Sequence, residues 1–346
     1  MKKKYFALIS MMLVVLLLAT ACGGGGNTST KPAEGESTSV AEGETKTLKL
    51  GHIAPPGTAY DGFATLFKEK VEAASSGRYV IDIYPAGQLG VDRELMESLQ
   101  IGNIDLTVIT ASDINQFVPE MAVQDLPYLF LSWEHVEAFL NSEAATDLYK
   151  LTDSVGMSTL SFMPRGFRHV ASNVKPIYTP ADIEGLKIRV AESEVYLDTF
   201  RALGTNAQAM AWGEVFTALQ QGTIDAHENT LITIKDYNMN EVQKYVSETG
   251  HFFAFAALQM NTNLLNGMDE ADQEIFRTAA LEAAVESGAE QRANEAATKE
   301  ELIEKGMEFN EVNDKKEFQD KVQSVYDKYL QTHDGTYIKA IQDLDY

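Results

Sequence analysis

Apolar and polar residues follow two different patterns along this chain of 346 residues, and the two patterns alternate. Residues 47–53 begin with strict alternation, and residues 79–84 and 104–110 are short runs of apolar and β-branched residues. Both arrangements are typical of strands. Residues 60–74 instead place apolar side chains three and four positions apart, which is typical of a helix with one buried face. Strands that alternate with helices predict an α/β fold with crossover connections.

The same alternation continues through the rest of the chain. We expect a helix over about 133–150, strands at 157–162 and 186–190, a helix over about 194–203 and a strand at 252–260. Pro164 and Gly166 interrupt regular structure, so residues 165–171 are predicted to cross between two halves of the molecule. Lobe I is predicted to comprise 47–165 and about 255–294, and lobe II to comprise 166–254 and about 295–346.

Two segments of the chain resemble each other. The sequence E-L-M-E-S-L-Q-I-G-N-I-D occupies residues 94–105, and E-V-F-T-A-L-Q-Q-G-T-I-D occupies residues 214–225, an offset of 120 (214 − 94). Each predicts the end of a helix, a glycine in the left-handed turn that stops it, and the start of a strand. Two such units predict two similar lobes, and the cleft between two lobes is a common ligand site.

A long segment near the C-terminus is rich in alanine and glutamate. Residues 269–306 contain no proline, and a single helix of this length would extend about 55 Å. That exceeds one lobe, so we expect the helix to run along both. Two helices broken near Gly288 are the alternative.

The N-terminal residues predict export from the cytoplasm. Residues 1–21 have a basic start, an apolar run and small residues at the end, which predicts a signal peptide too short to span a membrane as a helix. The sole cysteine, Cys22, follows directly and precedes four glycines, which resembles a bacterial lipobox. We expect lipidation of Cys22 and anchoring to the outer face of the cell membrane; cleavage before an incidental cysteine is the alternative. Residues 22–46 hold little that could be buried and predict a flexible tether.

The charge of the chain excludes some partners. Residues 1–21 hold three lysines and no acid, so the remainder carries 25 basic and 51 acidic residues, a formal charge of 25 − 51 = −26. Such a surface argues against binding nucleic acid or anionic lipid headgroups. A site for an anion would have to be made locally, because salt screens the net charge beyond about 8 Å.

Motifs for catalysis are missing from the sequence. His227-Glu228 resembles the start of a zinc-protease motif, but Leu231 stands where the second histidine belongs. There is no G-x-S-x-G elbow and no calcium loop, and a lipidated Cys22 cannot act as a nucleophile. We therefore expect no enzyme activity, no cofactor and no metal.

Four residues are candidates for binding an anion in the cleft. Arg189 lies on a predicted strand, and Arg168 lies where the chain crosses between lobes. Asn229 ends the strand of the second repeat, and Trp212 precedes its helix. Open α/β sheets bind ligands at the carboxyl ends of their strands, which favours Arg189 and Asn229. Surface, turn and core roles are the alternatives.

At these residues the chain resembles a known family, the DctP-type solute-binding receptors of TRAP transporters. The motifs are Y-P-A-G-Q-L-G-V-D-R-E (84–94), L-P-Y-L-F (126–130), G-F-R-H-V (166–170), P-x-D-I-E-G-L-K-I-R-V (180–190), M-A-W-G-E-V-F-T-A-L-Q-Q-G-T-I-D (210–225), H-E-N (227–229) and E-V-Q-K-Y (241–245). The resemblance implies a two-lobed receptor outside the cytoplasm that captures a small carboxylate. It also implies delivery to a permease of two membrane subunits driven by a sodium gradient.

The resemblance also implies roles for individual residues. Arg189 matches the arginine that forms the principal salt bridge to the ligand carboxylate, and Arg168, Asn229 and Trp212 match further binding positions. The other side of the cleft is matched by His52, Asp92 and Thr110, at positions that vary with the ligand. A planar guanidinium suits this role because it gives a carboxylate two parallel donors.

Glu192 departs from the expected pattern. If it faces the ligand, it would accept from hydroxyls and disfavour a second carboxylate, so a uronate would be preferred to a C4-dicarboxylate. If it does not, it is a helix N-terminal acid. Three other classes stay open: a binding protein of an ATP-driven importer, a ligand-sensing partner of a receptor kinase, and a secreted lipoprotein enzyme.

Overall fold

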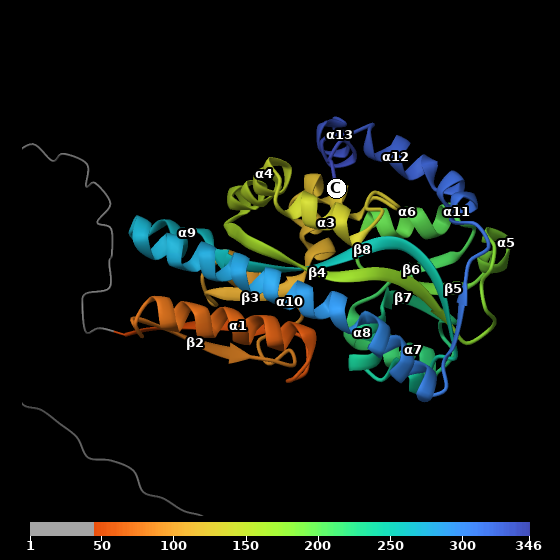
Figure 1. Cartoon of the computed structure of the whole chain (residues 1–346), viewed down its shortest axis with the longest axis horizontal. Coiled ribbons are helices and arrows are strands. Elements are labelled where there is room, and N and C mark those ends of the chain that lie inside the picture. The colour runs from red at the N-terminus through yellow and green to blue at the C-terminus, as the bar shows by residue number, and fades with distance from the viewer. Residues whose placement is uncertain (1–44) are drawn as a thin grey trace, which may run out of the picture. The chain divides into compact units, whose positions relative to one another are not determined.

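The computed structural model describes residues 45–346 (Figure 1). The predicted signal peptide, Cys22 and nearly all of the predicted tether lie outside the described residues. Within residues 45–346, no helix is both long enough and apolar enough to cross a membrane.

One sheet of nine strands runs through the described part of the chain. The strands are β1 (Lys46–His52), β2 (Tyr79–Tyr84), β3 (Leu106–Thr110), β4 (Met157–Ser172), β5 (Lys187–Val190), β6 (Asn206–Ala209), β7 (Ala226–Thr230), β8 (Tyr245–Asn261) and β9 (Glu308–Glu311). Their order is β2-β1-β3-β8-β4-β7-β5-β6, with β9 paired to β8.

The long antiparallel strands β4 and β8 join two halves of this sheet. β3 pairs with residues 256–260 of β8, and β7 pairs with residues 168–172 of β4. The parallel strands β1, β2 and β3 therefore form one half, and β5, β6 and β7 form the other (Figure 1). The chain thus has the two-lobed α/β fold that its motifs predict, and the β4–β8 pair connects the lobes.

Helices cover both halves of the sheet. They are α1 (Ala59–Ala74), α2 (Asp92–Gln100), η1 (Ala111–Gln116), η2 (Pro119–Asp125), α3 (Trp133–Leu140), α4 (Glu143–Leu151), η3 (Thr152–Val155), α5 (Pro180–Ile183), α6 (Glu194–Ala202), α7 (Trp212–Gln220), α8 (Leu231–Asp236), η4 (Met239–Glu241), α9 (Thr262–Asn266), α10 (Glu270–Glu304), α11 (Lys315–Lys321), α12 (Gln323–Tyr329) and α13 (Thr336–Gln342). Separate apolar cores lie under α1 in one lobe and under α7 and α8 in the other.

The two repeated segments have the same structure. Each ends its helix, α2 or α7, at a glycine with positive φ, 75° at Gly102 and 69° at Gly222. Asp105 Oδ2 then accepts from the backbone N of Lys49 at 2.8 Å, and Asp225 Oδ2 accepts from the backbone N of Lys187 at 3.1 Å. Each aspartate therefore ties the start of its own strand to the parallel strand beside it.

The long C-terminal helix is continuous. α10 spans 35 residues, which is about 52 Å, and it packs on α1 of one lobe and α8 of the other (Figure 1). Gly288 lies where the helix crosses β4, and a Cβ atom there would stand 2.4 Å from Pro164 Cγ. The glycine therefore permits close packing at the crossing instead of breaking the helix.

Two predicted elements differ from the structure. The helix expected over 133–150 is divided into α3 and α4, because Ser142 caps a new helix by accepting from the backbone N of Ala145 at 3.3 Å. The interruption expected at Pro164 and Gly166 is absent, since both residues lie within β4. β4 keeps its pairing with β8 there through shifts in register.

The end of the chain also differs from the predicted division into lobes. Residues after about 295 were assigned to lobe II, but α13 packs on α4 of lobe I. His135 Nε2 lies 2.8 Å from the backbone oxygen of Ile341 in this contact. The C-terminal helices therefore touch both lobes.

Candidate functional site

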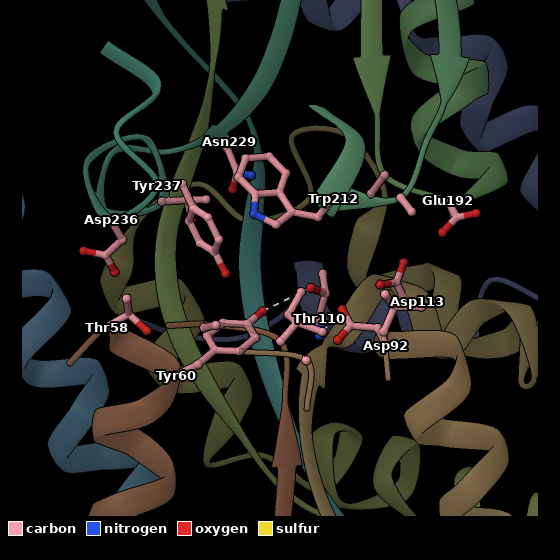
Figure 2. A pocket seen from close by; sticks show the side chains of 18 of the residues that line it. Thr58, Tyr60, Asp92, Thr110, Asp113, Glu192, Trp212, Asn229, Asp236 and Tyr237 are labelled. Atoms are coloured by element: carbon pink, nitrogen blue, oxygen red, sulfur yellow. Dashed lines mark hydrogen bonds between the residues drawn. The ribbon is translucent and has the colours of Figure 1, made fainter. Parts of the chain in front are cut away.

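A cavity of about 330 Å³ lies between the lobes, at the carboxyl ends of the strands (Figure 2). One wall comes from α1, α2 and the segment after β3, and the other from β5, β7, α7 and α8. Three hydrogen bonds link elements of the two sides: Ala59 N to Asp236 Oδ2 at 3.3 Å, Arg165 Nη1 to Tyr60 OH at 3.1 Å, and Asn115 Nδ2 to Ser193 Oγ at 3.3 Å. The walls are therefore in contact around the cavity.

Arg189 is a buried cation without a carboxylate partner. It lies on β5, is 4% exposed, lines the cavity, and forms no ion pair with any residue of 45–346. Its Nε and Nη2 donate to the backbone oxygen of Met210 at 2.8 and 2.6 Å, which leaves Nη1 and one hydrogen of Nη2. Burial lowers the pKa of Arg189 to about 10, so the cation persists at neutral pH but is poorly compensated.

Trp212 provides an aromatic face beside this cation. The guanidinium carbon of Arg189 lies 5.3 Å from the Trp212 ring centroid, and Tyr237 meets the same indole edge-on at 5.1 Å. Both aromatic residues line the cavity (Figure 2). Arg189 and Tyr237 hold the Trp212 indole in place, and the indole offers an apolar surface next to Arg189.

Arg168 is also buried at the cavity, but its charge is compensated. Its Nε and Nη2 donate to the two carboxylate oxygens of Glu228 at 2.6 and 2.8 Å, and Nη1 donates to Asn229 Oδ1 at 3.0 Å. Burial alone would raise the pKa of Glu228, but Arg168 and His251 hold it at about 2. With one more bond from Nη2 to the Glu228 backbone oxygen, Arg168 retains a single Nη1 hydrogen for a ligand, and Asn229 retains its amide donors.

Arg165 is a second buried arginine without an ion pair among the described residues, and the sequence reasoning missed it. Its Nη1 and Nη2 donate to Tyr60 OH at 3.1 Å and to Thr233 Oγ1 at 2.5 Å, and the guanidinium stacks 4.6 Å from the Tyr60 ring centroid. It lines the cavity at the crossing between lobes. The sequence predicts that residues 165–171 cross between the lobes, and this position is the feature that could have indicated Arg165 as a site residue.

The wall contributed by lobe I is acidic. Asp92 begins α2 and Asp113 lies in η1, and the two carboxyl groups are within hydrogen-bonding reach of each other (Figure 2). Burial raises the pKa of Asp92, and burial together with the charge of Asp92 raises the pKa of Asp113 well above its usual range. Thr110 is beside them, with its backbone N donating to Asp92 Oδ2 at 3.3 Å and its Oγ1 3.1 Å from Tyr60 OH.

Most of the predicted site residues line this cavity. They are Arg189, Arg168, Asn229, Trp212, Asp92, Thr110 and Glu192. Glu192 is exposed at the edge of the cavity. His52 is the exception, because it is completely buried and absent from the cavity wall. Its Nε2 lies 3.3 Å from Asp61 Oδ1, and Asp61 Oδ2 accepts from the backbone N of Gly57, so His52 supports the loop after β1 instead.

Asp113, Tyr60, Asp236 and Tyr237 also line the cavity and were not predicted. Asp113 follows the carboxyl end of β3, so the rule that favoured Asn229 in the second repeat could have found it in the first. No group of His, Cys, Asp and Glu within residues 45–346 is arranged to hold a metal ion.

A family comparison identifies the type of protein. The DctP model, a bacterial extracellular solute-binding protein of family 7, matches residues 50–332. The chain belongs to this family. The resemblance to TRAP solute-binding receptors is thereby confirmed, and such members bind solutes outside the cytoplasm and are not enzymes.

Three solved TRAP periplasmic solute-binding proteins are similar to this DctP-family chain. One from Bordetella bronchispeptica, with density assigned to pantoate, is 36% identical with a TM-score of 0.84, over 87% of this chain and 100% of its own. One from Polaromonas sp. JS666, bound to D-erythronate, is 33% identical with a TM-score of 0.84, over 88% and 100%. One from Pseudomonas putida F1, with bound D-glucuronate, is 30% identical with a TM-score of 0.82, over 87% and 98%.

Proposed function

We propose that this protein captures a hydroxylated monocarboxylate, such as a uronate or another sugar acid, and delivers it to a sodium-driven TRAP permease. The observation that carries the proposal is Arg189, a buried guanidinium at the cavity with no carboxylate partner among residues 45–346. A ligand carboxylate bound to Nη1 and Nη2 would compensate this charge with two parallel hydrogen bonds. The remaining donors of Arg168 and Asn229 would satisfy the other carboxylate lone pairs.

The acidic side chains around the cavity favour a ligand with one carboxylate. Asp92, Asp113 and Glu192 all line the cavity. A second ligand carboxylate near them would be repelled, whereas hydroxyls would find acceptors there. These contacts support a hydroxy acid over a C4-dicarboxylate.

The ligands of the solved relatives support the same class. Pantoate, D-erythronate and D-glucuronate each combine one carboxylate with two or more hydroxyls. The cavity of about 330 Å³ is within the range of small-molecule sites. Trp212 would cover an apolar or ring face of such a ligand.

A thermal-shift screen tests the ligand class. We expect D-glucuronate, D-galacturonate, D-erythronate or pantoate to raise the melting temperature, since a ligand at a hundredfold excess over its Kd stabilises by about 2.7 kcal/mol. Succinate, malate and uncharged glucose should give little shift. The Arg189→Ala variant should lose the response to the acids. Stabilisation by succinate alone, or by glucose with Arg189 removed, would contradict the proposal.

The delivery step needs a separate test. We propose that lipidated Cys22 and the segment to residue 46 hold the receptor beside the permease. Deletion of the gene for this protein should abolish cellular uptake of the acid. Collapse of the sodium gradient, with ATP maintained, should also abolish uptake. Uptake that follows ATP instead would favour an importer of the ATP-driven class, and lost signalling with normal uptake would favour a sensory role.

A further inference from the structure

Asp92 and Asp113 form a pair of carboxyl groups on the cavity wall. Asp92 is 8% exposed, and its Oδ2 accepts from the backbone N of Thr110. Its buried Oδ1 receives no hydrogen bond from the N–H and O–H donors of residues 45–346. The carboxyl of Asp113 is within hydrogen-bonding reach of the Asp92 carboxyl and can donate to it only when protonated. Figure 2 shows both side chains at the lobe I side of the cavity.

The charged and titratable groups around the pair come from β4, from β5 and the segment after it, from α1 and α2, and from Tyr237 after α8. Arg165 of β4 and Arg189 of β5 favour its ionised form, whereas Glu192 after β5 and Tyr60 of α1 do not. Arg93 on α2 also lines the cavity, but its Nε donates to Glu97 at 3.0 Å. Neither Arg165 nor Arg189 forms an ion pair with Asp92 or Asp113.

We propose that Asp92 and Asp113 share one proton in the empty cavity, and that this acid–carboxylate pair binds a hydroxyl of the anionic ligand. The inference rests on the proposed function for the identity of the ligand. Two carboxyl groups in contact in a buried site resist double ionisation, because the second negative charge is neither solvated nor paired. The single proton makes one carboxyl a donor and leaves the other an acceptor.

This arrangement matches the chemistry of a hydroxyl. An alcohol both donates and accepts one hydrogen bond readily, so it can accept from the protonated Asp113 and donate to the Asp92 carboxylate. Two ionised carboxylates could only accept, and would leave the hydroxyl oxygen without a donor from this wall. The shared proton also keeps the pair at one negative charge while a second anion, the ligand, is bound at Arg189.

The shared proton couples binding to pH. A bound anion disfavours loss of the proton, so at a pH where the empty pair has already lost it, binding takes one proton from the solvent. The Kd should then rise with pH above the titration of the empty pair, approaching tenfold per pH unit. Below that titration the Kd should not depend on the pair.

The proton can be tested first without any ligand. Infrared difference spectra of the full chain between about pH 5 and pH 9 should contain protonated-carboxyl absorption that titrates in the wild type and is reduced by one carboxyl in Asp113→Asn; the absorption that remains is expected from buried Asp125, whose pKa burial raises to about 7. Asp82→Asn, which makes the same change at an exposed position on β2, should retain all of the wild-type absorption. Equal absorption in the wild type and Asp113→Asn would overturn the shared proton whatever the protein binds.

Calorimetry with D-glucuronate, D-galacturonate and D-erythronate tests the coupling. In two buffers of different ionisation enthalpy, the wild type should take up close to one proton per acid bound at high pH, and Asp113→Asn should take up none and bind with a Kd independent of pH. Binding without proton uptake in the wild type would overturn the coupling while leaving the proposed function intact. No binding of any acid at any pH, with the infrared difference between wild type and Asp113→Asn present, would instead overturn the proposed function.

Discussion

The two walls of the cavity are built on the same αβ unit and carry opposite chemistry. In lobe I the unit of α2 and β3 presents Asp92 and is followed by Asp113, and in lobe II the unit of α7 and β7 presents Trp212 and Asn229 beside Arg189. The glycine turns, and the aspartates Asp105 and Asp225 that join neighbouring strands, are alike in both. The repeat therefore fixes the scaffold, and the residues at the carboxyl ends of its strands determine what each wall binds.

The walls also differ in how they stabilise buried charge. Lobe II contains a complete ion pair, Arg168 with Glu228, and an incomplete one, Arg189. Lobe I contributes two acids, and neither forms an ion pair with any residue of 45–346. Replacing a single charged residue should therefore change the pH dependence of stability in opposite directions for the two walls.

The largest effect is expected from the complete pair. Glu228→Gln leaves Arg168 buried and uncompensated, so the free energy of unfolding should fall by about 3 kcal/mol at pH 7. The pKa of Glu228 is about 2 in the folded chain, below its unfolded value, so its contribution is present above about pH 4.5 and is lost as pH falls toward 2. Denaturant titrations at neutral and acid pH check this. Glu308→Gln, at an exposed pair with Lys244, should change little.

The incomplete pair should control affinity. Arg189→Lys should weaken binding of a recognised acid on the order of tenfold or more, because an ammonium cannot give two parallel hydrogen bonds. Calorimetry measures this directly. Arg292→Lys, at a half-buried arginine of α10 that pairs with Glu137 away from the cavity wall, is the matched control and should bind normally. Equal affinity in the two variants would remove Arg189 as the anchor of the carboxylate.

Removing one acid from the lobe I wall should weaken its selection against a second ligand carboxylate. At a pH above the titration of the Asp92–Asp113 pair, Asp113→Asn retains a donor for a hydroxyl but removes a negative charge that would oppose a second carboxylate. We expect the preference for D-glucuronate over malate to fall on the order of tenfold, mainly because malate binds better. Competition in the thermal-shift assay measures the ratio. An unchanged ratio would show that lobe I does not select against dicarboxylates.

The same variant should respond to pH in the direction opposite to Glu228→Gln. The raised pKa of Asp113 means that the folded state retains a proton that the unfolded state has lost, so stability falls as pH rises above the usual range of an aspartate. Asp113→Asn should therefore gain on the order of 1 kcal/mol over the wild type between about pH 5 and pH 8. Urea titrations at both values check the sign, and a constant difference would contradict it.

The smallest effect is expected at the indole. Trp212→Phe keeps an aromatic face but reduces its area and its attraction for the Arg189 guanidinium, so the Kd should rise about threefold. Trp212→Ala should cost more, because it also removes the surface that covers the ligand. Trp133→Phe, at an indole of α3 outside the cavity wall, is the control for the Kd measurement and should leave the Kd unchanged.

Much of this fold was predictable from local pattern, and the exceptions have identifiable causes. β1, β2 and α1 lie close to their predicted bounds because a period of two or of 3.6 is visible within each. β4 was predicted to end before Pro164, and only its pairing with β8, nearly a hundred residues away, explains why it continues to Ser172. The role of Gly288 likewise depends on its contact with Pro164, which no local pattern reveals.

The site was predictable to the extent that its residues follow strands or match the family. Arg189, Asn229 and Asp92 were found in this way, and each lines the cavity. Asp113 follows the carboxyl end of β3 but was missed, because the short 3-10 helix that places it on the cavity wall has no periodic pattern of its own. The pairing of Arg168 with Glu228 was also beyond prediction, because adjacent strands had to be paired before their register could be known.

The register shifts between β4 and β8 have a consequence for how ligand preference can change. Two of them fall at Pro164/Gly166 and Arg168/Val170, so Arg165 and Arg168 lie where the strand pair that joins the lobes is least regular. A substitution there would alter both the hydrogen-bond donors to the anion and the strand pair that connects the lobes. Asp92 and Asp113 lie on short elements outside this strand pair. We therefore expect the ligand preference to change through substitutions at positions 92 and 113, while Arg165 and Arg168 stay unchanged.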